Sequence, residues 1–232
     1  MRSPDDVFQD LENDRNQRES EVRLIENLAK QAGSDQEKSM LLRSLVLLTY
    51  AHLEGFCKFA LLAYSGAINS LRIPCREAAF PVLAASLGDI LAALRNLDSK
   101  APEFRTVLPD DKDLHMLWRE RTFVESYETV MSKTVEIPDR VVDTKANLNT
   151  RVLKRNLYQL GLNYPEVDEH RGAIDRLLGV RNAIAHGDAL RNPGAEEVGG
   201  YTAAAFEVMK FVQRSVYSAL RDERFKRQPA AS

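Results

Sequence analysis

Cysteine and an excess of basic charge are both missing from this sequence. Only two of the 232 residues are cysteines, Cys57 and Cys75, and they lie in no C-x-x-C or other ligand-like spacing. This excludes a disulfide framework, gives no sign of a zinc site and fits a reducing cytoplasm. The net charge of -2 excludes a chain that coats nucleic acid through its overall charge. Any contact with nucleic acid must therefore be local.

Long uninterrupted apolar stretches are also missing. The N-terminal sequence MRSPDDVFQDLENDRNQ lacks the apolar stretch of a secretory signal, so we expect no export through such a signal. The most apolar segment, residues 40–64, is interrupted by Arg43, His52, Glu54 and Lys58. Such side chains are costly at the centre of a bilayer. We therefore expect a core helix, no membrane contact and a cytoplasmic location.

Helical periodicity dominates the rest of the chain, and no segment shows the period-two alternation of a half-buried strand. The hydrophobic fraction of 44% is sufficient for a buried core. The sequence predicts an all-α fold in one domain, residues 1–232. Its main predicted helices are an N-terminal helix over 3–33, a core helix over 35–72, a helix over 166–187 that ends in the motif described below (the motif helix), and a C-terminal helix over 197–225. Shorter helices are predicted over 80–97, 110–131 and 150–160, with an irregular surface loop over 135–149.

Residue types at the helix ends support these boundaries. Ser34 and Glu37 match a capping box, in which each side chain accepts a hydrogen bond from the backbone near the other residue. Gly187 follows the motif helix and is predicted to cap it, because glycine tolerates a left-handed conformation.

The segment RNAIAHG, residues 181–187, has the groups needed for phosphodiester chemistry at a helix end. Asn182 and His186 share one helix face, so the amide could hydrogen-bond the imidazole and fix its tautomer. His186 lies at the negative end of the helix dipole, which suits it to donating a proton to a leaving oxygen. Arg181 supplies a guanidinium for charge that builds on phosphate oxygens. The predicted catalytic residues are Arg181, Asn182 and His186.

Chemistry of this kind needs no metal. The 2′-hydroxyl of RNA can attack the adjacent phosphate when a base, an acid and an anion stabiliser are in place, so we expect no metal and no other cofactor. One motif has a single histidine, so two copies would most simply supply the acid and the base, and we expect a homodimer. The alternative is that an Arg-x4-His spacing arose by chance and that the histidine only caps carbonyl groups.

Basic residues gather around the motif. Residues 140–191 hold 9 basic and 6 acidic side chains, whereas residues 1–39 hold 6 and 10. A polyanion such as RNA would be attracted to the first segment, although such residues more commonly just solvate helix faces. The possible RNA-binding residues are Lys145, Arg151, Lys154, Arg155 and Arg176.

Glu54, Lys58 and two histidines have structural interpretations beside functional ones. Glu54 and Lys58 are four residues apart, so they could form an intrahelical ion pair or line a cleft beside the motif. His52 lies in otherwise apolar sequence and is interpreted as a core histidine rather than a base. His115 lies in charged sequence and is expected to be exposed.

Two stretches resemble the HEPN superfamily, in particular its MAE_28990-like ribonuclease branch. The first is YAHLEGFCKFALLAY, residues 50–64, which is similar to an early core helix with its pattern around Glu54, Gly55 and Lys58. The second is ANLNTRVLKRNLYQLGLNYPEVDEHRGAIDRLLGVRNAIAHGDAL, residues 146–190, which ends in the motif.

The resemblance implies a dimerising helical bundle with metal-independent endoribonuclease activity that leaves a cyclic phosphate. It implies RNA as the substrate and, because such proteins often act in toxin–antitoxin or phage-defence systems, a possible antitoxin or defence partner. Arg181, Asn182 and His186 match the family's Arg-polar-x3-His motif. Some members lack activity, so the alternative is an inactive HEPN module that binds a protein or nucleotide as a dimeric subunit, or a purely structural helical subunit.

Overall fold

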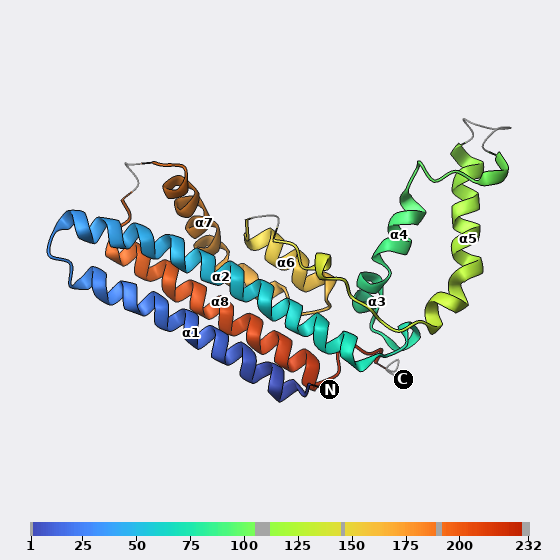
Figure 1. The fold of residues 1–232 in the computed structure, drawn as a ribbon, viewed down its shortest axis with the longest axis horizontal. Helices are drawn as coiled ribbons and strands as arrows, with labels where there is room; N and C mark the ends of the chain where they lie inside the picture. The colour runs from blue at the N-terminus through green and yellow to red at the C-terminus, as the bar shows by residue number, and fades with distance from the viewer. Residues whose placement is uncertain (1, 105–111, 145–146, 189–191, 229–232) are drawn as a thin grey trace.

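The computed structural model describes residues 2–104, 112–144, 147–188 and 192–228. Within these ranges the chain forms eight α-helices and no strand, which confirms the all-α prediction. Three long helices form a bundle in which α1 and α8 both pack along α2 (Figure 1). Their bounds are Pro4–Lys30 for α1, Asp35–Leu71 for α2 and Ala195–Arg221 for α8.

The remaining helices lie outside this bundle. Helices α6 and α7 pack on one side of it, and α3, α4 and α5 extend from one of its ends (Figure 1). Their bounds are Phe80–Ser86 for α3, Gly88–Arg95 for α4, Lys112–Ser132 for α5, Thr150–Gln159 for α6 and Arg171–Ala185 for α7.

Capping residues start the first two long helices. The Ser3 backbone N–H donates to Asp6 Oδ2 at 2.8 Å and the Asp6 backbone N–H donates to Ser3 Oγ at 3.1 Å, which makes a complete capping box. The predicted box at Ser34 is only half present. Ser34 Oγ accepts from the Glu37 backbone at 3.2 Å, but the Glu37 carboxylate accepts from the Gly33 backbone instead.

Helix α2 is the core helix, as predicted. It is long and apolar enough to cross a membrane by composition alone, but half of its most apolar window is buried inside the bundle. Each fully buried large apolar side chain contributes roughly 1.5–3 kcal/mol, so packing rather than helix propensity holds α2 in place. Its largest fully buried side chains are Leu45, Tyr50, Leu53, Phe56, Leu61, Tyr64 and Ile68.

Several predicted boundaries were wrong. The helix predicted over 80–97 is divided at Leu87, where ψ is 11° and α3 gives way to α4. The motif helix predicted over 166–187 begins as a 3-10 segment, Pro165–His170, and becomes α-helical only at Arg171. Glycine at 199 and 200 does not delay α8, which begins at Ala195. The N-terminal helix ends at Lys30, before the predicted end at Gly33.

The segment over 135–149 was predicted as an irregular surface loop. Apart from the 3-10 segment Asp139–Val141 its described residues are irregular, but the predicted surface location was wrong. Its apolar side chains are buried in the core, including Val135 and Ile137. The backbone N–H of Val135 donates to the Ile73 carbonyl at 2.8 Å, and the Asn69 side chain bonds both backbone groups of Ile137. These bonds satisfy the polar backbone that burial removes from water, so a segment without helical periodicity can still be buried.

Candidate active site

Arg181 lies half-buried on α7 and is fixed by three neighbours. Its Nη1 donates to Asn147 Oδ1 at 3.2 Å and to Asn182 Oδ1 at 2.8 Å. Its Cζ lies 4.8 Å from the centroid of the Tyr50 ring on α2. Among the described residues, all hydrogen bonds of this guanidinium come from Nη1. Nε and Nη2 can therefore still donate to an anion.

Tyr50 connects the core helix to this guanidinium. The ring is buried, and its hydroxyl donates to the Leu148 carbonyl at 3.3 Å. Burial raises the pKa of Tyr50 to about 12, and the negative charge of Glu54 acts in the same direction. The hydroxyl therefore stays neutral and keeps donating under ordinary conditions.

Glu54 and Lys58 separate in the structure. The Glu54 carboxylate lies beside Tyr50. Lys58 is exposed and lines a different hollow, with Asp139, Arg140 and Asp143. Within the described ranges the two side chains form no ion pair with each other, so the structural interpretation of this pair was wrong.

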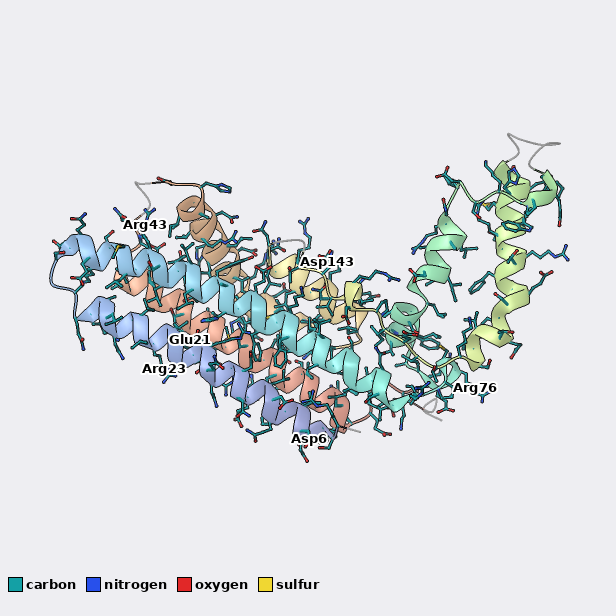
Figure 2. The ribbon with its side chains drawn as sticks, viewed as in Figure 1. Asp6, Glu21, Arg23, Arg43, Arg76 and Asp143 are labelled. Atoms are coloured by element: carbon teal, nitrogen blue, oxygen red, sulfur yellow. The ribbon has the colours of Figure 1, made fainter. Side chains whose placement is uncertain are left out.

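His186 lies at the C-terminal end of α7 with its residue exposed. Gly187 follows with φ of +83°, and the Asp188 backbone N–H donates to the Ala183 carbonyl at 3.0 Å. This is a Schellman ending, which confirms the predicted glycine cap. Arg43 of α2, labelled in Figure 2, donates from Nη1 to the Asp188 carbonyl at 2.9 Å. The segment after His186 is thus tied to the core helix.

The predicted hydrogen bond between Asn182 and the His186 ring is not present among the described residues. Asn182 Oδ1 accepts from Arg181 instead, while the Asn182 backbone carbonyl accepts from the His186 backbone at 2.9 Å. A bond from a charged donor is stronger than one from a neutral ring, which explains this choice. Asn182 therefore positions Arg181 and leaves the imidazole free to turn toward another molecule.

Sequence reasoning missed Asn147 and Tyr50 as parts of this site. Asn147 precedes Asn149, whose side chain accepts from the Val152 backbone at 2.9 Å and caps α6. A polar residue just before a predicted cap is a weak signal, because turns are rich in asparagine. Tyr50 lies in the apolar core helix and has no sequence feature that separates it from a packing residue.

The predicted RNA-binding residues fall into two groups. Lys154 Nζ pairs with Asp168 Oδ2 at 2.5 Å, and Arg155 donates to the Asp143 carbonyl and to Asn156 Oδ1, so these two cations help to hold the fold. Arg151 and Arg176 are exposed and form no ion pair with other described residues. Lys145 lies outside the described residues.

Acidic and metal-ligating side chains do not gather near the motif. In the part of the chain that the structure describes, no group of three or more His, Cys, Asp or Glu side chains is placed to hold a metal ion.

Comparison with known families decides the relationship of this chain. A family model described as RiboL-PSP-HEPN matches residues 13–218. The chain belongs to the RiboL-PSP-HEPN family. The resemblance to the HEPN superfamily is thereby confirmed, whereas the finer MAE_28990-like branch stays a prediction. No match was found among curated proteins or among solved structures.

The RiboL-PSP-HEPN match extends over the long-helix bundle and the motif together. It includes α2 and α7, which carry Tyr50 and Arg181, and it also includes α3, α4 and α5 outside the bundle.

Proposed function

We propose that this chain is a metal-independent endoribonuclease, in which the 2′-hydroxyl of RNA attacks the adjacent phosphate. Arg181 stabilises the charge on the phosphate oxygens and His186 transfers a proton. The observation that carries this proposal is the guanidinium of Arg181, held through one nitrogen by Asn147 and Asn182, five positions before an exposed histidine at the end of α7. Donors that are fixed before the reaction stabilise a transition state most effectively. HEPN domains are commonly endoribonucleases, which supports the same conclusion.

The enzyme acts as a homodimer in this proposal. A single His186 cannot readily serve as base and acid in one step, whereas two copies facing each other supply both. Asn182 and His186 lie four residues apart and so share a face of α7. Gly179 lies on the same face, and the space that a side chain would occupy at this position is open. This face is open for a second copy to approach.

The cellular role proposed with this activity is that of a toxin or phage-defence effector in the cytoplasm. It would act as one domain, residues 1–232, and be controlled by an antitoxin or a defence-system partner protein. The support is the family resemblance of the motif, since HEPN ribonucleases often occur in such systems.

An inactive HEPN module that binds a protein or nucleotide is the second candidate. One observation favours it. Arg181 is already bonded within the chain, and among the described residues the His186 ring has no partner that would orient it. In this interpretation the motif only shapes a dimer surface.

The test is cleavage of mixed-sequence RNA and matched DNA in the presence of a chelator. The wild type should cut RNA alone, and His186→Ala should lose about 100-fold or more in rate, as expected when a proton-transfer group is removed. His170→Ala is the matched control, because His170 lies at the other end of α7 and its side chain makes no capping bond. Arg181→Ala should also impair cleavage while α7 stays folded, since both residues favour helix.

Three outcomes separate the candidates. RNA cutting that depends on His186 but not on His170 supports the enzyme. Equal inactivity of folded wild type and His186→Ala supports the non-catalytic module. Magnesium-dependent cutting of both RNA and DNA contradicts the proposed mechanism, because DNA lacks the attacking hydroxyl.

A further inference from the structure

Helix α6 presents cations and a tyrosine on one face that the core does not use. Arg151, Lys154 and Tyr158 follow one another at intervals of three and four residues, so they form one stripe along the helix. Arg151 is exposed and Tyr158 is 64% exposed. The opposite face of α6 is buried and accounts for the packing of this helix, through Val152, Leu153, Asn156 and Leu157.

A second tyrosine lies beside the end of this stripe. Gly161, with φ of +70°, turns the chain after α6 and brings Tyr164 back against it. The rings of Tyr158 and Tyr164 lie 5.5 Å apart between centroids and nearly perpendicular, at 85°. Lys154 Nζ lies 5.8 Å from the centre of the Tyr164 ring, which is itself 37% exposed. Packing in the core does not explain two neighbouring rings in contact with water.

The other end of the stripe borders a large open pocket between α6 and α7. Its volume is about 620 Å³, and its cationic lining residues are Arg151, Lys154 and Arg171. Its two carboxylates are already engaged within the chain. Asp168 pairs with Lys154, and Asp175 accepts from the backbone and the hydroxyl of Thr150. Arg151 has no ion pair among the described residues, and Arg171 is 3.9 Å from Asp175, so both can turn toward an anion.

The lining residues of the pocket lie close in sequence to residues of the candidate active site. Asn147, which bonds Arg181, lies three residues before Thr150 at the start of α6. Leu178 lines the pocket and lies one helical turn before Asn182 on α7. The stripe from Arg151 to Tyr158 extends over about 10 Å at 1.5 Å per residue, and it begins at the end of α6 that is nearer in sequence to Asn147.

We propose that this stripe is a binding track for single-stranded RNA that leads to the motif, an inference that rests on the proposed function. Arg151 and Arg171 bind backbone phosphates, and Tyr158, supported by Tyr164, stacks on unpaired bases. Stacking on tyrosine tolerates any base because every base has an aromatic face. A duplex keeps its bases stacked inside and offers only its backbone. The track therefore selects single-stranded RNA without a strict sequence.

The experiment measures binding of a fluorescent mixed-sequence RNA oligonucleotide, single-stranded and as a duplex, to the full chain carrying His186→Ala, so that the probe is not consumed. Adding Tyr158→Ala should weaken binding of the single strand by about 5-fold to 100-fold, with little effect on the duplex. Tyr158→Phe keeps the ring and should bind as the parent does. Tyr127→Ala is the matched control, because it makes the same substitution at a 45% exposed tyrosine on α5, outside the stripe.

The salt dependence of binding distinguishes the phosphate contacts of Arg151 from the base stacking of Tyr158. Arg151→Gln should reduce the slope of log Kd against log salt by about one, whereas Tyr158→Ala should leave that slope unchanged. The track is overturned if Tyr158→Ala binds single strands as well as Tyr127→Ala does, if Tyr158→Phe is as weak as Tyr158→Ala, or if the parent does not bind single strands at all. Binding that depends on Tyr158 in a wild-type chain that never cleaves RNA would refute the ribonuclease and keep the track. RNA cleavage at the same rate with and without Tyr158 would support the ribonuclease and refute the track.

Discussion

Arg181 of the motif helix lies over the ring of Tyr50 of the core helix, with 4.8 Å between its Cζ and the ring centroid. The ring is buried, so the guanidinium rests on a rigid part of the bundle rather than on a loop. A cation over an aromatic face is stabilised by about 0.5–2 kcal/mol, according to how far it is removed from water. The position of the Arg181 guanidinium is therefore set by α2 as well as by α7.

Replacing Tyr50 tests this support. Tyr50→Leu removes the ring and should lower RNA cleavage by roughly 10-fold to 100-fold, because a small displacement of a catalytic group is costly. Tyr50→Phe keeps the ring and loses only the bond to the Leu148 carbonyl, so it should cost about 0.5–1.5 kcal/mol of stability with cleavage nearly unchanged. Cleavage rates and urea unfolding distinguish the two. Equal cleavage by both folded variants would show that the ring does not position Arg181.

Asn147 is a positioning residue in this account, since it acts through Arg181. Asn147→Ala should lower kcat by roughly 10-fold and leave KM nearly unchanged, because the charge on the phosphate grows only in the transition state. Asn163→Ala, on an exposed turn, provides a control of the same type. A rise in KM alone would instead indicate that Asn147 serves substrate binding.

The ending of the motif helix gives a prediction about stability. Gly187 has φ of +83°, where a side chain is strained, so Gly187→Ala should cost about 1 kcal/mol. Gly66 lies inside α2 with open space around its Cβ position, so Gly66→Ala should add up to about 1 kcal/mol through helix propensity. Urea midpoints of both variants measure this. A gain in stability for Gly187→Ala as well as for Gly66→Ala would mean that the helix end does not need the left-handed conformation of Gly187.

How far the sequence predicts this molecule depends on the kind of signal. The capped, periodic helices such as α2 are predictable because local residues determine them. The burial of the segment around Ile137 is not, since it depends on a bond from Asn69, which is 68 positions away. The same holds for the site. Arg181 and His186 are visible as a motif, whereas Asn147 and Tyr50 reach Arg181 only through the tertiary fold.

The histidines show the same limit. His115 was expected to be exposed, but it is buried and its Nδ1 accepts from the Ala101 backbone at 3.1 Å. His52 is partly buried where α2 packs on α1, with Nε2 3.0 Å from Glu21 Oε2 and Nδ1 3.4 Å from Arg18 Nη1. Arginine can only donate, so Nδ1 accepts and the proton of the neutral ring lies on Nε2.

His52 gives a prediction about pH. Burial lowers its pKa, with Arg18 acting in the same direction and Glu21 and Asp14 opposing. The unfolded chain therefore binds this proton more tightly than the folded chain. The stability that His52 contributes is present above its ordinary pKa of 6.5 and is lost as pH falls below that value. Urea unfolding at pH 7.5 and 5.5 should show a larger loss for wild type than for His52→Gln. An equal loss would contradict the assignment.

The central claim is that Arg181 and His186 direct the 2′-hydroxyl of RNA at its own phosphate. The most direct measurement uses an RNA oligonucleotide with one deoxynucleotide at the linkage that the wild type cuts, incubated with chelator, with the product ends identified by mass. The account predicts a 2′,3′-cyclic phosphate from the all-RNA strand, no cutting at the deoxy linkage and no product from His186→Ala. Cutting at the deoxy linkage, or ends with a free 3′-hydroxyl, would contradict it.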